Sequence, residues 1–271
     1  MLNKIIKKLI TLLTLSSILL PQFTLAVNSH TTDLELTSSQ GFTLADSADF
    51  GWGTNSTISW WVNFESIPGE GVFQTFLAQS IANQRWGQLQ FMLEGGVEKF
   101  VWHSYNHCSD TGLAETNARI NYDVTVGTWY HVAYVQTGTT WELFINGVSQ
   151  GTTTIDDSEN CSADWWLGFD QGTNQEFDGK LDDFRIYPTT ALTATQILAD
   201  YNCELTDYTN LTVYYQFNNS ANEVVGVGAS TDNLTAVNTP TYQTADLPFT
   251  AACAAAGGVA APIHPFIWNL F

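Results

Sequence analysis

Two adjacent carboxylates, Asp182 and Asp183, lie in the middle of residues 179–187 (GKLDDFRIY), which have the pattern of a β-strand. Neighbouring side chains of a strand point to opposite faces, so we expect Asp182 to share an apolar face with Phe184, and Asp183 to share the other face with Arg185. A buried carboxylate needs a cation, hydrogen-bond donors or a proton. The segment therefore predicts a place where a loop is held onto the sheet, through an ion, a base such as Arg185, or backbone amides.

A second kind of chemistry is suggested by paired tryptophans beside amide side chains. In residues 56–64 (STISWWVNF), Trp60 falls on the same strand face as Ile58, Val62 and Phe64, and Trp61 falls on the other. We therefore expect Trp60 in the core and Trp61 on the opposite, concave face. Exposed aromatic rings stack on sugars, and amides beside them hydrogen-bond sugar hydroxyls. Packing between two sheets is the alternative use of such rings. The predicted ligand-binding residues of this face are Trp61, Asn63, Gln88 and Gln90.

These side chains must be positioned by short strands, because most of the sequence from residue 33 to residue 249 alternates polar and apolar residues between turn signals. Strands are expected at 56–64, 87–96, 164–170, 179–187 and 211–218, and two more with a turn at Gly138 within 128–151. Asn146-Gly147 predicts a tight hairpin turn. One short helix is expected near 193–201, capped by Thr193, with Ile197, Leu198 and Tyr201 on one side. The pattern is that of an all-β, two-sheet antiparallel sandwich of the jelly-roll kind.

The first 26 residues read as a secretory signal peptide. A basic start is followed by an apolar run and then by Thr24-Leu25-Ala26, whose small residues suit cleavage. The run is short for a bilayer span, so we expect cleavage, a secreted or cell-surface protein, and no membrane span afterwards. An uncleaved anchor is the alternative. We expect one domain over 27–250, followed by an apolar tail over 251–271.

The charge balance argues against nucleic acids as partners. The leader holds three lysines and no acid, so the remaining chain has 27 acidic and five basic residues, a formal charge of −22. A surface of this sign repels nucleic acid and anionic membranes. We therefore expect no nucleic-acid partner.

Four cysteines follow the leader, and an even number in a secreted chain predicts disulfide bonds. Cys108 and Cys161 both lie in polar, loop-like segments, which favours pairing them. That leaves Cys203 with Cys253, a bond that would tie the C-terminal segment to the body.

The order of segments LADSADFG, STISWWVNF, TWYHVAYVQTG, WELFINGVSQG and FDGKLDDFRIYPTTALTATQIL resembles the laminin-G-like jelly-roll domains of the concanavalin A-like lectin/glucanase superfamily. The resemblance covers residues 34–202, and LTVYYQFNNSANE is similar to the strand that closes the family's sandwich. It implies two antiparallel sheets, one of them curved with a concave face. The fold serves carbohydrate binding, adhesion and, in a minority, glycoside hydrolysis.

The resemblance also implies a calcium ion, because many members hold a structural one near the position of Asp182. Calcium binds six to eight hard oxygens. The implied ligands are Asp46, Asp49, Asp182 and Asp183. The alternative is that the two strand aspartates bond to backbone N–H groups or to Arg185 or Arg119.

The family's glucanases carry Glu-x-Asp-x-x-Glu on one strand, and that string is missing here, so we expect no enzyme activity. The sequence favours a secreted, non-catalytic recognition or adhesion module that binds a polysaccharide or a glycoprotein and is stabilised by calcium. The first alternative is a structural or assembly subunit that self-assembles through the apolar tail. The second is an unusual glycoside hydrolase.

Overall fold

A computed structural model of the protein describes residues 29–46, 50–51, 53–81, 84–105, 116–155, 162–170, 175–205, 207–218 and 232–248. The predicted signal peptide, the C-terminal tail, Asp49, Cys108, Cys161 and Cys253 lie outside these residues.

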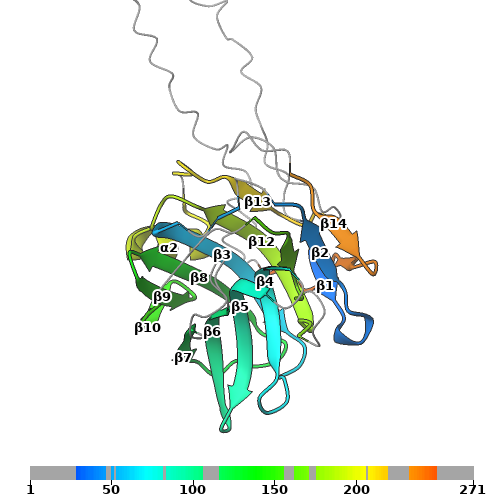
Figure 1. Ribbon diagram of the computed structural model, residues 1–271. Helices are drawn as coiled ribbons and strands as arrows, with labels where there is room; N and C mark the ends of the chain where they lie inside the picture. Colours follow the sequence, from blue (N-terminus) through cyan, green and yellow to red (C-terminus); the bar gives the residue numbers. More distant parts are fainter. Residues whose placement is uncertain are drawn as a thin grey trace, which may run out of the picture.

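The described residues form two antiparallel sheets packed face to face, as predicted (Figure 1). Sheet A has the order β10-β9-β8-β3-β12-β1-β15, and β13 pairs with β12 beyond the end of β1. Its strands are β1 (Thr31–Leu34), β3 (Asn55–Phe64), β8 (Trp129–Thr137), β9 (Thr140–Ile145), β10 (Val148–Thr154), β12 (Gly179–Tyr187), β13 (Val213–Tyr215) and β15 (Thr241–Gln243).

Sheet B has the order β14-β2-β11-β4-β5-β6-β7. Its strands are β2 (Gly41–Leu44), β4 (Phe73–Ile81), β5 (Gln84–Glu94), β6 (Val97–Tyr105), β7 (Thr116–Asn121), β11 (Trp165–Leu167) and β14 (Thr235–Val237). A 3-10 turn, η1 (Leu36–Ser38), follows β1.

Aromatic side chains fill the space between the sheets. Trp60 is fully buried there, with its ring 5.2 Å from Phe76 of sheet B and 5.9 Å from Tyr134 of sheet A. Trp102 of β6 and Trp141 of β9 stack across the interface at 4.6 Å. The period-2 alternation of the sequence thus produces the core that it predicts.

The predicted helix is α2 (Ala194–Tyr201), and it lies beside β3 and β8 on the outer face of sheet A (Figure 1). Thr193 caps it through a reciprocal capping box with Gln196. Ile197 is buried against the sheet, but Leu198 is 44% exposed, so the expected apolar side of the helix is narrower than predicted. A second apolar cluster forms between α2 and sheet A, separate from the main core.

The Asn146-Gly147 turn joins β9 to β10 as predicted. Both residues have positive φ, 51° and 77°, which suits a tight two-residue hairpin.

β12 contains a β-bulge that the sequence pattern does not reveal. Its pairing with β3 shifts register between Asp182 and Arg185, and Asp183 has a φ of +51°. Asp182 consequently pairs with Trp61 on the outer face, whereas Phe184 packs in the core. The expectation that Asp182 shares the face of Phe184 is therefore wrong.

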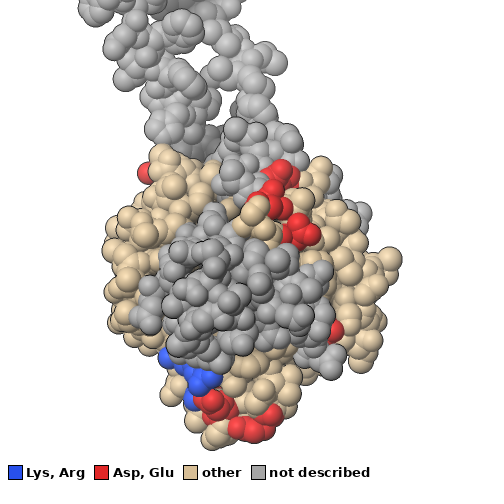
Figure 2. Space-filling model, viewed as in Figure 1, with Lys and Arg blue, Asp and Glu red and all other residues tan. Residues whose placement is uncertain are grey.

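The surface view agrees with the charge balance of the sequence. Figure 2 shows small groups of acidic atoms on the visible face and basic atoms only beside acidic ones. Lys99 and Arg119 both pair with Glu94, at 2.6 and 3.1 Å. Within the described part of the chain, no helix is long and apolar enough to cross a membrane.

Candidate functional site

Four neighbouring strands of sheet A place polar side chains in one row across its outer face. Asp33 of β1 pairs with Lys180 of β12, Lys180 pairs with Asn63 of β3, and Asn63 pairs with Trp129 of β8. Cross-strand partners share a face, so these residues form a continuous polar strip at one end of the sheet. We call this strip, together with Glu65 and Asp246, the polar end of sheet A.

Asp246 holds the polar end together by accepting hydrogen bonds from three directions. Its carboxylate accepts from the amide of Asn63 at 3.3 Å, from Lys180 at 3.1 Å and from Trp129 Nε1 at 3.2 Å. Lys180 also pairs with Glu65 at 3.0 Å. Partial burial opposes the charged form of Lys180, but the hydrogen bonds to Glu65 and Asp246 outweigh it and raise its pKa.

The polar end is accessible to a ligand. The side chains of Asp246 and Glu65 remain 48% and 34% exposed, and Trp129 is half-buried. Because its Nε1 is bonded to Asp246, the indole ring of Trp129 is held in one orientation. A fixed, partly exposed aromatic ring beside amide, ammonium and carboxylate groups is the arrangement that sugar recognition uses.

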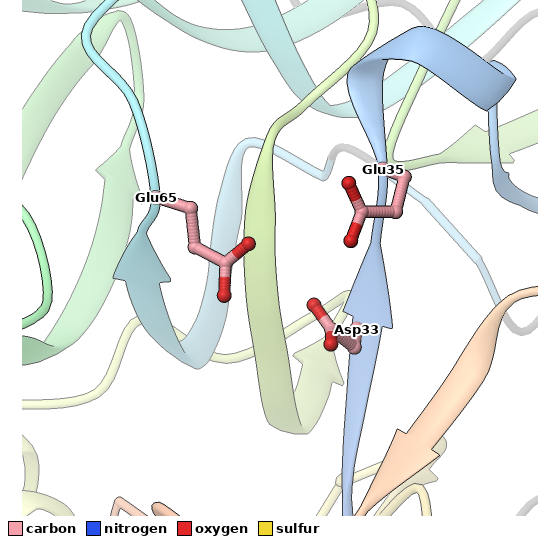
Figure 3. Close-up of side chains that lie close together, drawn as sticks. All are labelled: Asp33, Glu35 and Glu65. Atoms are coloured by element: carbon pink, nitrogen blue, oxygen red, sulfur yellow. The ribbon is translucent and has the colours of Figure 1, made fainter.

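Three carboxylates converge next to this strip, and we call Asp33, Glu35 and Glu65 the acidic cluster. One oxygen from each lies within 4.8 Å of the others. Figure 3 shows Glu65, at the end of β3, pointing across β12 towards Asp33 and Glu35. Burial and the charge of Glu65 raise the pKa of Asp33, and burial together with Asp33 and Glu65 raises the pKa of Glu35.

A separate charge network lies buried between α2 and sheet A. Arg185 pairs with Asp183 and with Asp200 of α2, both at 2.8 Å, and Tyr214 donates to Asp183 at 2.7 Å. Burial raises the pKa of the Asp200 carboxyl, but the charge of Arg185 and hydrogen bonds from His131 and Ser59 outweigh burial and lower the pKa to about 2. The network joins the helix to the sheet through the buried ion pair between Arg185 and Asp200.

The buried charge network engages Asp183, which is one of the predicted calcium ligands. Both oxygens of Asp183 are engaged by Arg185 and Tyr214, so Asp183 does not fit an ion, and the alternative of pairing with Arg185 is the one the structure shows. Asp182 accepts from the backbone N–H of Asp183 at 2.8 Å, and Asp46 accepts from Ser162 at 2.8 Å. Among the described residues, Asp46, Asp182 and Asp183 belong to no group of three converging ligands, and Asp49 lies outside them.

The outer face of sheet A, which the sequence predicts to be open at Trp61, is covered there by α2. Trp61 is on the outer face of sheet A, opposite the core residue Trp60, but it is only 3% exposed because its ring lies 5.7 Å from Tyr201 of α2 and 5.3 Å from His131. Asn63 is also buried, yet its amide belongs to the polar end through Asp246.

Gln88 and Gln90 lie together on the outer face of sheet B, on β5, but both are fully buried. Gln90 donates to Thr75 and to Gln175, each at 3.0 Å. Trp61, Asn63, Gln88 and Gln90 are all buried, because strand alternation gives the face of a side chain and not what covers that face. Their role in ligand binding stays a prediction.

Cys203 follows α2 with a φ of 59° and is disulfide-bonded. Its partner lies outside the described residues, so both predicted pairings remain predictions.

Most of the acidic cluster and of the polar end was missed from the sequence. Asp33 and Glu35 are two residues apart, as are Asn63 and Glu65, a spacing that puts each pair on one face of a strand. That signal is local, and only the pairing of β1 and β3 with β12 brings the two pairs together.

The comparison with known families agrees with this architecture. A family model described as "Concanavalin A-like lectin/glucanases superfamily" matches residues 36–198. The chain belongs to this superfamily. No curated protein sequence matches the chain significantly.

Solved structures share the fold at low sequence identity. A putative carbohydrate binding protein from Bacteroides ovatus superposes with a TM-score of 0.61 at 16% identity, over 82% of this chain and 61% of that chain. A heptameric SAP-like pentraxin from Limulus polyphemus superposes with a TM-score of 0.55 at 13% identity, over 80% of this chain and 96% of that chain. At these identities the similarity concerns the fold.

Proposed function

We propose that this protein is a secreted, non-catalytic module that binds carbohydrate, on a polysaccharide or a glycoprotein, through the polar end of sheet A. The observation that carries the proposal is Trp129, half-buried and held by Asp246 beside Lys180 and Glu65. Of the described tryptophan side chains, only Trp129 and Trp166 are more than slightly exposed. Membership of a lectin/glucanase superfamily, and a structural relative named as a putative carbohydrate binding protein, support the same reading.

Recognition is favoured over hydrolysis by the arrangement of the acids. Glycosidases place an acid and a base or nucleophile on either side of the scissile bond. In the acidic cluster the three carboxylates point towards one another instead, and Glu65 is engaged by Lys180 (Figure 3). Release of reducing sugar from a bound glycan by the purified protein would contradict this part of the proposal.

The ligand site is tested by changing Trp129 on a glycan array and then by calorimetry with the best glycan. Trp129→Ala is expected to weaken binding by about tenfold or more, because aromatic anchors dominate such contacts. Trp129→Phe keeps a stacking ring but loses the Nε1 bond that orients it, so it is expected to lose less affinity than Trp129→Ala.

Trp166→Ala is the matched control, since Trp166 is a partly exposed tryptophan on the outer face of sheet B. Full affinity in Trp129→Ala, or an equal loss in Trp166→Ala, would contradict the assignment of the site. Failure of the unmodified protein to bind any glycan would contradict the proposed function.

A further inference from the structure

The acidic cluster has the geometry of a cation site that joins two strands of sheet A. Asp33 comes from β1, Glu35 follows β1, and Glu65 follows β3, while β12 runs between them (Figure 3). One oxygen from each side chain lies within 4.8 Å of the others. We propose that Asp33, Glu35 and Glu65 bind a divalent cation of the calcium type, which fastens the end of β1 to the end of β3 across β12.

A buried and unsatisfied oxygen of Asp33 points to a ligand independently of the clustering. Asp33 is only 7% exposed, and its Oδ2 accepts from Gln243 at 3.1 Å. Within the described part of the chain, its Oδ1 has no hydrogen-bond partner. A buried carboxylate oxygen without a donor is costly, and Asp33 points towards Glu35 and Glu65, where a cation would satisfy it (Figure 3).

Lys180 neutralises only part of the cluster. It lies next to Asp33 in the sheet, but its single positive charge pairs with Glu65 at 3.0 Å and is shared with Asp246 at 3.1 Å. Asp178 adds a further negative charge near Asp33 and Glu35. Together these acids leave an excess of negative charge around the buried Asp33, which a divalent cation would relieve.

The segments that carry the ligands are held in place without the ion. The backbone N–H of Glu35 donates to the side chain of Gln40 at 3.0 Å, and that of Leu36 donates to Asp178 at 3.2 Å. Ser66, next to Glu65, donates its hydroxyl to Asp178. Binding therefore requires little ordering of the chain, which favours affinity.

The ligand chemistry selects the class of cation. The three side chains supply only hard carboxylate oxygens, which suit calcium, magnesium or manganese better than zinc or copper, whose sites are usually built with nitrogen or sulfur ligands. Three carboxylates from two separate strands make an irregular set that water completes, and calcium accepts such a set more readily than magnesium, which needs a near-ideal octahedron. We expect a dissociation constant of about 0.1–1 mM, as in extracellular calcium modules.

The test measures cation binding to the purified protein with no glycan present, so its outcome is independent of the carbohydrate proposal. After treatment with EDTA, the protein is titrated with calcium chloride and, separately, magnesium chloride, and binding is followed by calorimetry and by the unfolding temperature. Calcium in hundredfold excess over its dissociation constant is expected to raise the unfolding temperature by about 5 °C or more. Magnesium is expected to bind more weakly.

Two variants locate the site. Asp33→Asn and Glu35→Gln should each weaken calcium binding by about tenfold or more, because affinity follows the number of ligand charges. In EDTA both should unfold at the same temperature as the unmodified protein or higher, because like-charge repulsion is reduced. Asp123→Asn, which changes an exposed acid outside the cluster, should behave as the unmodified protein.

Lack of calcium binding by the unmodified protein up to about 10 mM would overturn the proposal, since that exceeds the expected dissociation constant at least tenfold. Unchanged calcium affinity in both Asp33→Asn and Glu35→Gln would also overturn it, because the ion would then bind elsewhere. A loss of stability in EDTA for both variants, together with an unchanged calcium affinity, would show that these carboxylates serve as hydrogen-bond acceptors and not as cation ligands.

Discussion

Asp200 shows how one buried carboxylate is kept charged in this protein. It lies on α2 and is reached by Arg185, His131 and Ser59, at 2.8, 3.2 and 3.0 Å. Helix periodicity puts Asp200 on the same side as Ile197, three residues earlier, so its burial could have been expected from the sequence. Its partner could not, because Arg185 comes from a strand whose bulge is invisible in the sequence pattern.

The lowered pKa of Asp200 predicts a specific loss of stability in acid. A carboxyl whose folded pKa, about 2, is below its unfolded value contributes stability above pH 4, and this contribution disappears as the pH falls towards 2. The contribution is about 2 kcal/mol. Urea unfolding from pH 5 to pH 2.5 should show the stability difference between the unmodified protein and Asp200→Asn shrinking. Asp123→Asn is the control, and a pH-independent difference for Asp200→Asn would argue against this account.

At the scale of the element, β3 lies between two packed layers. Its inner face contributes Trp60 to the core between the sheets, and its outer face contributes Trp61 to the contact with α2. The alternation of this strand is evident in the sequence. The cover over Trp61 depends on where α2 packs, which local patterns do not specify.

Both tryptophans of β3 should therefore matter for stability. Trp60→Ala and Trp61→Ala are each expected to lower the free energy of unfolding by about 3–5 kcal/mol, because each opens a cavity in a packed layer. Chemical denaturation measures both values, and hydrogen exchange should show added opening of α2 only in Trp61→Ala. A Trp61→Ala variant of normal stability would mean that α2 does not cover this face in solution.

At the scale of the whole molecule, every basic side chain that the structure describes is engaged by acids. Lys99 and Arg119 pair with Glu94, Lys180 pairs with Glu65 and Asp246, and Arg185 pairs with Asp183 and Asp200. Acidic residues far outnumber basic ones, so the acids outside these ion pairs carry the net negative charge of the protein. A module of this kind should stay soluble and recognise neutral ligands or cations more readily than anions.

The disulfide bond at Cys203 also concerns the whole molecule, because every other cysteine lies more than 40 residues away in the sequence. Non-reducing peptide mapping is expected to find Cys203 joined to Cys253 and Cys108 joined to Cys161. Each bond should contribute about 2–4 kcal/mol of stability, measured by unfolding with and without a reductant. Any other pairing in the map would contradict the prediction.

The sequence by itself determined the capped helix at Thr193, the hairpin turn at Asn146-Gly147, the superfamily and the strands β3, β5, β8, β9, β11, β12 and β13, because alternation, capping and turn chemistry are local properties of the chain. Only the tertiary structure decided that a bulge turns Asp183 to Arg185, that α2 covers Trp61, and that β12 brings Asp33 and Glu35 beside Glu65. These outcomes depend on strand register and on the packing of segments more than 100 residues apart, such as Asp33 and Lys180. A register is set by the sum of many non-local contacts, so no short stretch of sequence contains it.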